Sequence, residues 1–456
     1  MPSGNSSSVI LDVNAGNPAE QPEALPLQAA SDDPFRILIL GDFCRGEHRP
    51  SLAARRPQRI DRDNFDDVLR NMKVGANLRL GANVTLQLHF TSLADFEPDS
   101  IFARCELFRA AAPAQRATSA PAAATSASME PSIESDVARL TSGSLLDDIV
   151  EQADVPRPAE GPAKAKDDLQ SVIDRVVAPH LVQPEDHSAA DQRSAVLMRA
   201  ILHHPEFQAV EAAWRALDLV ARGLDTDGAL GLYVLDVTRA ELELGLDDLP
   251  IRTQRWAVIA GNYVFDRSER DVQLLAKLGA LARRAGAPFL AESAPPDEDS
   301  ATPEWRALRA SPDARWIGLA LPRFLARIPY GRQTYAVESF PFEEIDGRPE
   351  HGDYLWANPA FVCAWLLGRA FNEFGWKFRP GVVRQIDGLP CHSFEAEGEI
   401  ESQPCGEVLL TDRQIEFIHD QGLMALASMK NRDVVMLVRF QSIAAPLAAL
   451  AGRWLN

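Results

Sequence analysis

The hydrophobic pattern is most regular in the middle of the chain, in the segment ILHHPEFQAVEAAWR (Ile201 to Arg215). Its apolar residues recur close to the 3.6-residue period of a helix that buries one side. Because proline suits the first turn of a helix, we expect a break between His204 and Pro205. Phe207 and Trp214 lie two turns apart on one face and are predicted to form a buried aromatic anchor.

Strand patterns alternate with helical patterns after this segment. Helices are expected at Arg239 to Gly245, Arg270 to Ala285 and Ala360 to Phe374. Strands are expected at Leu230 to Asp236, Trp256 to Ala260, Pro288 to Ala291 and Trp316 to Leu321. Alternation at this spacing predicts a largely parallel α/β sheet. Beyond Leu389 the pattern changes, and EGEIESQPCGEVLL indicates a strand, a turn and a second strand.

The beginning of the chain predicts a smaller set of elements. VILDV (Val9 to Val13) reads as one strand, followed by a leash rich in Pro, Gln and Ala. Strands are expected at Phe35 to Leu40 and at Asn83 to Phe90, with a basic loop, RRPQRIDRDN, between them. The residues before Phe65 can cap a helix that begins there. Ala110 to Ser128, almost all Ala, Pro, Ser and Thr, cannot bury enough apolar surface to fold and is predicted to be a linker.

Composition and charge favour a globular protein of more than one domain. At 456 residues the chain is too long for one core, and a hydrophobic content of 46% is that of a globular protein. The net charge of −19 argues against nucleic acid or an anionic membrane as the main partner. Five cysteines without CxxC spacing are typical of reduced thiols in the cytosol. Neither an export signal nor an apolar run of bilayer length is visible, so a cytoplasmic protein is expected.

The segment ILILGDFCRG is the nearest approach to a nucleotide-binding loop, since a predicted strand leads into Gly41 and Gly46. A phosphate-binding loop requires a lysine and a hydroxyl residue directly after its second glycine, but Glu47 and His48 follow here. The GxGxxG spacing of dinucleotide-binding proteins is also absent. A turn at the end of a strand is favoured, and a nucleotide-binding enzyme is kept as an alternative.

Two groups of candidate metal ligands have simpler interpretations. His203 and His204 lack the spacing that places two ligands on one face of a helix, so capping or packing is favoured. The acidic run from Asp61 to Asp67 lacks the glycine and the glutamate of a calcium loop, so helix capping is favoured there. No metal ion is expected.

Two candidate catalytic pairs lack further partners in the sequence. Glu343 with Glu344 could act as a general acid and base, and Cys391 with His392 as a nucleophile and its base. No third catalytic group lies near either pair, and adjacent residues rarely reach the required geometry. No catalytic residue and no cofactor are therefore assigned.

Four blocks in order resemble the large subunit of the type VI secretion contractile sheath. They are ILHHPEFQAVEAAWRAL, Trp256 to Pro295, Leu319 to Glu344 and Tyr354 to Trp376. Three earlier segments, ILILGDF, IDRDNFDDVL and LHFTSLADFEPDSI, resemble the small subunit of the same sheath. They lie between Val9 and Phe108. The resemblance implies a small and a large sheath subunit fused in one chain.

The resemblance also implies a domain organisation. A small α/β sheath-like domain (1–109) is joined by an Ala/Pro/Ser linker (110–144) to a larger, mostly parallel α/β region (145–388). A truncated C-terminal sheath-like region (389–456) follows, without a complete C-terminal interlocking domain. In the family, such subunits have no reaction of their own and act by subunit packing and strand exchange. The implied partners are sheath subunits or baseplate proteins, the inner tube and a recycling ring ATPase, with no nucleic acid and no membrane insertion.

Two interface elements follow from the resemblance and from the residues. The strand Val9, Ile10, Leu11, Asp12 and Val13 is expected to be donated to the sheet edge of a neighbour. Arg323, Arg327 and Arg332 flank an aromatic turn, and interchain salt bridges are their expected use. A chain that donates a strand without receiving one would end a stack. A sheath-end cap, a baseplate-proximal subunit or a regulatory paralogue is therefore the alternative to a propagating subunit.

Overall fold

The structure is a computed structural model that describes residues 30, 32–45, 49–80, 85–111, 189–296 and 302–454. The described residues up to 111 are called the N-terminal region, and those from 189 onward the C-terminal region. The strand expected at Val9 to Val13 lies outside the described residues. So does the expected linker, apart from Ala110 and Ala111.

A nine-stranded sheet is the largest element of the fold, and it is mostly parallel, as the sequence predicts. Its strand order is β11-β15-β14-β8-β7-β6-β1-β5-β2. The strands from β14 to β5 in this order run parallel, while β2, β15 and β11 pair antiparallel at the two margins. The bounds are β1 (Phe35–Gly41), β2 (Gln58–Ile60), β5 (Leu230–Asp236), β6 (Val258–Phe265), β7 (Phe289–Ser293), β8 (Ile317–Leu321), β11 (Gln385–Ile386), β14 (Met424–Ser428) and β15 (Val435–Leu437).

Strand β1 comes from the N-terminal region but lies inside this sheet. It pairs with β5 on one side and with β6 on the other, both in parallel. Its sequence FRILILG is apolar almost throughout because both faces of a central parallel strand are covered. The N-terminal region also supplies the marginal strand β2, which pairs with β5. The two regions therefore build one sheet together.

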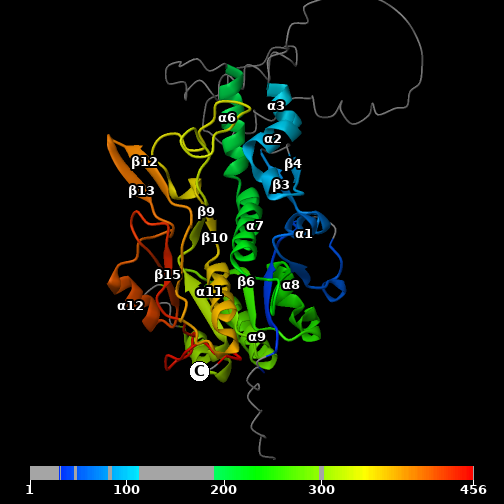
Figure 1. The fold of residues 1–456 in the computed structure, drawn as a ribbon, viewed down its shortest axis with the longest axis vertical. Coiled ribbons are helices and arrows are strands. Elements are labelled where there is room, and N and C mark those ends of the chain that lie inside the picture. Colours follow the sequence, from blue (N-terminus) through cyan, green and yellow to red (C-terminus); the bar gives the residue numbers. More distant parts are fainter. Residues whose placement is uncertain are drawn as a thin grey trace, which may run out of the picture.

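Helices cover both faces of the sheet (Figure 1). On one face, α11 (Pro359–Phe374) packs across β1, β6, β7 and β8 and contacts α7 (Pro205–Gly223). On the other face, α8 (Arg239–Leu244) and α9 (Glu269–Ala285) share a second core cluster with α10 (Pro303–Ala310) and α12 (Asp412–Asp420). Gly286, at φ 65°, ends α9 in a left-handed conformation that favours glycine.

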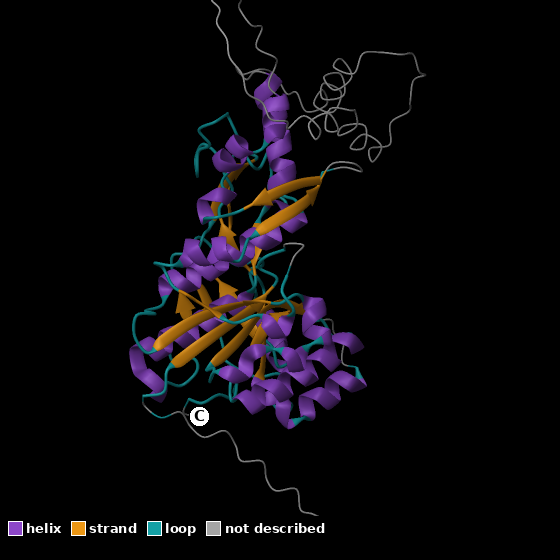
Figure 2. Cartoon of the chain, turned by 90° about the vertical axis from the view of Figure 1, so that its right-hand side faces the viewer, coloured by secondary structure: helices purple, strands orange, loops and turns teal. Residues whose placement is uncertain are grey.

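Smaller elements lie above the sheet in the side view (Figure 2). The N-terminal region contributes α1 (Phe65–Asn71), the pair β3 (Gly75–Arg79) and β4 (Thr85–His89), the 3-10 helix η2 (Leu93–Phe96), α2 (Pro98–Arg104) and α3 (Glu106–Ala111). The C-terminal region contributes α6 (Ala189–Leu202), the pair β9 (Phe324–Arg327) and β10 (Leu355–Ala357), and the hairpin β12 (His392–Ala396) and β13 (Glu399–Gln403).

Three local expectations differ from the structure. Gln58–Ile60, expected within a basic loop, forms β2, because pairing with β5 outweighs a polar sequence in which only Ile60 is buried. The strand expected at Trp256 begins at Val258 and runs on to Phe265. The segment that begins at Glu397 is expected to form a strand, a turn and a second strand, but the turn of the β12–β13 hairpin lies at its start. Glu397 and Gly398 both have positive φ, so they form the turn rather than a strand.

Candidate functional site: the intramolecular interface

The aromatic residues of α7 join the two regions. The predicted break holds, because α6 ends at Leu202 and α7 begins at Pro205, with the His204 side chain accepting from the backbone N–H of Glu206. Phe207 and Trp214 are both fully buried on one face of α7. Their aromatic ring partners belong to the N-terminal region.

Trp214 lies edge-on between two phenylalanine rings of the N-terminal region. Its ring centroid is 5.7 Å from that of Phe43 and 5.6 Å from that of Phe65. Its indole Nε1 also donates a hydrogen bond to the carbonyl oxygen of Phe43 at 3.1 Å. Phe207, two turns nearer the start of α7, makes the same kind of contact. Its ring centroid lies 5.9 Å from each of those of Phe90 and Phe96. The anchor therefore holds the N-terminal region against α7.

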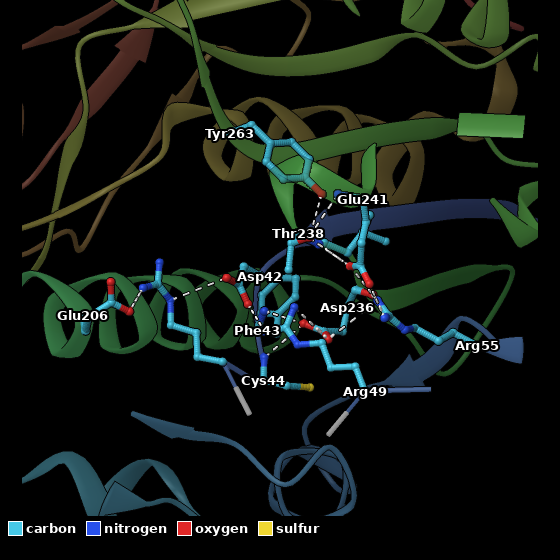
Figure 3. Close-up of polar contacts among 12 residues, drawn as sticks. Asp42, Phe43, Cys44, Arg49, Arg55, Glu206, Asp236, Thr238, Glu241 and Tyr263 are labelled. Atoms are coloured by element: carbon cyan, nitrogen blue, oxygen red, sulfur yellow. Dashed lines mark hydrogen bonds and ion pairs between the residues drawn. The ribbon is translucent and has the colours of Figure 1, made fainter. Parts of the chain in front are cut away.

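A polar cluster continues the interface at the carboxyl ends of β1 and β5 (Figure 3). The carboxylate of Asp236, which is buried at the end of β5, accepts from the backbone N–H groups of Phe43 at 2.8 Å and Cys44 at 3.0 Å. The Arg49 guanidinium lies 3.5 Å from the same carboxylate. Asp236 thus fixes the chain just after β1 to the end of its neighbouring strand.

Arg55 extends this cluster to the start of α8. Its guanidinium donates to the backbone oxygen of Asp236 at 2.6 Å and to the carboxylate of Glu241 at 3.0 Å. Glu241 also closes a capping box with Thr238, which begins α8. Burial would raise the pKa of Glu241, but the hydrogen bonds from Arg55 and Thr238 outweigh burial and hold that pKa at about 2. The carboxylate is therefore charged at neutral pH and remains paired with Arg55.

These contacts bear on the nucleotide-binding alternative. The backbone N–H groups of Phe43 and Cys44 are the ones that a phosphate at the end of β1 would use, and the Asp236 carboxylate already accepts from both. Burial, together with the charge of Asp236, raises the pKa of the Cys44 thiol well above its ordinary range. Cys44 is thus a protonated packing residue. The arrangement favours the turn at a strand end over an anion site.

Arg327, one of the three predicted interface arginines, lies in a buried ionic network. Its guanidinium contacts the carboxylates of Glu211 and Glu344, each at 2.7 Å, and the Arg215 side chain shares Glu211 at 2.7 Å. The side chain of Arg327 is 5% exposed. Burial would raise the pKa of Glu344, but Arg327, His203 and the Tyr330 N–H outweigh burial and hold it at about 2. Arg327 therefore joins α7 to β9 and to the loop that carries Glu344.

Arg323 and Arg332 lie nearer the surface. Arg323 pairs with Glu407 at 2.6 Å and lies 3.8 Å from Glu292. Burial raises the pKa of Glu292 to about 7 in spite of Arg323. The backbone N–H of Arg332 donates to Glu343 at 3.1 Å. A single chain does not test interchain contacts, so the expected salt bridges of these arginines stay predictions.

The other candidate groups occupy separate places in the fold. The His392 ring is 3.0 Å from the Tyr354 hydroxyl. Glu344 belongs to the ionic network, whereas the Glu343 side chain accepts from Arg332. Asp61 accepts from the N–H groups of Asp63 and Asn64 in the turn before α1. Within the described part of the chain, no three acidic, histidine or cysteine side chains are grouped closely enough to hold a metal ion.

A pocket of about 690 Å³ opens beside the ionic network, and both regions line it. Glu97, Pro98 and Asp99 of the N-terminal region form one wall. Arg215 and Arg327 lie on another, and both already bind carboxylates of their own chain. The Asp99 carboxylate accepts from the N–H groups of Glu338 and Ser339, so it too holds the two regions together. The pocket is a gap along the interface, and the Arg215, Arg327 and Asp99 side chains in its walls already have partners within the chain.

Comparison with known proteins identifies the two regions. The family model of the EvpB/VC_A0108 tail sheath N-terminal domain, VipB, matches residues 188–254 and 251–444. The chain belongs to this tail sheath family. A second model, described as type VI secretion system, VipA, VC_A0107 or Hcp2, matches residues 23–117. The N-terminal region thus corresponds to the VipA match and the C-terminal region to the VipB match, as the resemblance in the sequence predicts.

One curated relative is the type VI secretion system sheath protein TssC1 of Pseudomonas aeruginosa. It is 32% identical over 302 residues, which are 57% of this chain and 61% of the relative. The chain therefore spans about three fifths of the length of that relative.

Two solved structures were also found by comparison of the fold. One is the anti-feeding prophage baseplate, at 16% identity and a TM-score of 0.30, covering 51% of this chain and 50% of that chain. The other is the anti-feeding prophage helical sheath in the contracted state, at 15% identity and a TM-score of 0.27, covering 49% and 51%.

The intramolecular interface is therefore the contact between a VipA-like region and a VipB-like region. Sequence reasoning found Phe207 and Trp214 but missed Phe43, Asp236 and Arg55. The position of Asp236, as the polar last residue of a buried strand, is the signal that could have pointed to it. Among the described residues, no helix is both long and apolar enough to cross a membrane.

Proposed function

We propose that this chain is a structural subunit of a type VI secretion contractile sheath, with its VipA-like and VipB-like regions acting as one unit. One observation carries the proposal. β1, from the VipA-like region, lies between β5 and β6 of the VipB-like region and pairs with both. Two regions that share a sheet cannot separate during assembly without breaking two strand pairings, so they move as one body.

The proposed activity is mechanical and involves no reaction. Charged groups at the interface are engaged across it, as Arg55 is with Glu241 and as the Asp99 carboxylate is with the N–H groups of Glu338 and Ser339. Contacts of this kind define one arrangement of the two regions. The extended sheath would then store energy at the contacts between subunits rather than within this interface, and contraction would release it.

The proposed partners are other sheath subunits or baseplate proteins, together with the inner tube and the ring ATPase that recycles contracted sheaths, in the cytoplasm. Val9 to Val13 would be donated to the sheet edge of a neighbour. Arg332 and Arg323 would reach carboxylates of adjoining subunits. The segment 110–144 would act as the linker between a small domain (1–109) and the larger region (145–388).

Electron microscopy tests the proposal. The purified chain is imaged alone and after mixing with separately purified type VI sheath subunits. Incorporation into sheath-like tubes supports the structural role. Decoration of only one end of a preformed sheath identifies the chain as a cap. Absence of any binding to sheath or baseplate proteins overturns the proposed function.

A further inference from the structure

Cations gather at the end of the molecule where the chain terminus lies. Arg255 and Arg453 both contact the Asp33 carboxylate, Arg255 at 3.8 Å, and Arg36 donates to the backbone oxygen of Arg255 at 3.5 Å. The Arg453 guanidinium also stacks 4.9 Å from the Trp376 ring, and the indole Nε1 of Trp376 donates to the backbone oxygen of Asp33 at 2.6 Å. This places the loop after α11 beside Asp33.

That loop adds two cations, Lys377 and Arg379, which are exposed and make no side-chain hydrogen bond or ion pair with any described residue. We define the basic pole as Arg36, Arg255, Lys377, Arg379 and Arg453. Arg453 is buried against Asp33, and the five cations outnumber Asp33 and its neighbour Asp32, in a chain whose net charge is −19. Two exposed apolar side chains, Phe374 and Val382, flank it.

An acidic surface lies toward the opposite end of the long axis. The hairpin β12–β13 carries Glu395, Glu397 and Glu399, all exposed and without an ion pair to any described residue. Glu401 is paired with Arg348 at 3.0 Å. Ile400, in β13, is 85% exposed. Figure 1 shows this hairpin in the upper part of the molecule and the chain terminus, next to the basic pole, at the bottom.

We infer that the basic pole of one copy binds the β12–β13 hairpin of a second copy, an inference that rests on the proposed sheath function and names its contact surface. Each surface presents unpaired exposed charges of one sign together with exposed apolar side chains, so the two are complementary. Single exposed ion pairs are worth little, but three glutamates facing several cations act together. Because the surfaces lie toward opposite ends of one molecule, their contact is head-to-tail and propagates.

Charge reversal tests this contact by sedimentation velocity of the full-length chain at about 50 mM and about 300 mM NaCl, since salt screens exposed charges. One variant carries Lys377→Glu and Arg379→Glu, and another carries Glu395→Lys, Glu397→Lys and Glu399→Lys. Each is expected to weaken self-association about tenfold at low salt. Combining all five substitutions is expected to restore most of it. The matched control, Lys277→Glu with Arg306→Glu, changes net charge as much as the first variant, at exposed positions outside the pole.

Three results would overturn the inference. The first is self-association that neither charge reversal weakens. The second is a combined variant whose self-association is not restored. The third is a deletion of residues 1–29 that abolishes association while the hairpin reversal leaves it intact. That deletion removes Asp12, Glu20 and Glu23 and no cation, so it would assign the pole to the terminal segment. If the charge-reversal variants still enter sheaths and self-associate as the wild type does, only this inference is overturned. Failure of the wild-type chain to bind sheath proteins overturns the proposed function.

Discussion

The indole nitrogen of Trp214 donates a hydrogen bond to the carbonyl oxygen of Phe43, and this bond joins a helix of the VipB-like region to the turn after the central strand of the VipA-like region. The two residues are 171 positions apart in the chain. Their rings also meet edge to face at 5.7 Å. A single side chain therefore contributes both apolar packing and a polar contact to the intramolecular interface.

Truncation of this side chain should be strongly destabilising. Trp214→Ala is expected to lower the free energy of unfolding by about 3–5 kcal/mol, because it leaves a cavity between Phe43 and Phe65. Trp214→Phe keeps most of the ring packing but leaves the Phe43 oxygen without its donor, and should cost about 1–3 kcal/mol. Urea unfolding of the three proteins measures both values. An unchanged midpoint for Trp214→Ala would contradict the structure.

Removal of the Asp236 carboxylate should release the turn after β1. Asp236→Ala leaves the buried N–H of Phe43 and that of Cys44 without an acceptor, and is expected to cost about 2–5 kcal/mol. Asp236→Asn retains one side-chain oxygen and should cost less. Hydrogen exchange at Phe43 and Cys44 provides the local readout. Equal protection in the wild type and the alanine variant would exclude this role.

Glu344 should make the protein sensitive to acid. Its pKa of about 2 lies below the ordinary value of 4.5, so its contribution to stability is fully present above pH 4.5 and is lost as the pH falls toward 2. Glu344→Gln leaves Arg327 partly unpaired and should destabilise by about 3–5 kcal/mol at neutral pH. The difference from the wild type should shrink as the pH falls below 4.5. Urea unfolding across this pH range gives the result, and a difference independent of pH would refute it.

Glu292 should behave in the opposite way. Its pKa of about 7 lies above the ordinary 4.5, so stability present below pH 4.5 is lost as the pH rises through 7. Glu292→Gln removes a buried charge at pH 8 and should stabilise the protein there by about 1–3 kcal/mol. Near pH 4.5 the substitution should have little effect. Thermal unfolding at both pH values tests this, and destabilisation at pH 8 would show that the pair with Arg323 dominates.

Cleavage of the linker should leave the two regions together. A protease site introduced near Ala123 separates the chain into two fragments, yet β1 remains hydrogen-bonded to β5 and β6. The fragments are expected to elute together from a sizing column at micromolar concentration and to separate only in denaturant. Ile39→Asp, which places a charge at a fully buried position of β1, is the control that should release the smaller fragment. Separation of the unmutated fragments would argue against a shared sheet.

The terminal strand gives the last prediction. Leu11→Pro removes a backbone donor and fixes φ, so it should abolish binding to sheath or baseplate partners if VILDV is donated to a neighbour. Leu11→Ala should retain most of the binding, because strand addition depends mainly on backbone hydrogen bonds. The unfolding midpoint of the isolated chain should not change in either variant. A pull-down with sheath proteins measures the effect, and equal binding by both variants would count against strand donation.

Local pattern was enough to predict much of the fold. The break at Pro205, the buried stripe from Phe207 to Trp214 and the alternation that led to a parallel sheet all depend on residues close together in the chain. Periodicity and capping act over a few residues, so they can be seen without any knowledge of the partners. The weaker elements were missed for the same reason. The sequence of β2 is polar, and its strand conformation depends on β5, more than 170 positions away.

The tertiary structure alone decided how the two regions meet. The sequence by itself shows that Phe35 to Leu40 is a buried strand, but an apolar strand is compatible with many neighbours. Likewise, the sequence shows that Asp236 ends a buried strand, and only the fold shows that its carboxylate accepts from the N–H groups of Phe43 and Cys44. Pairings of this kind are chosen by the free energy of the whole packed chain. They depend on contacts between residues far apart in sequence, which no local sequence pattern shows.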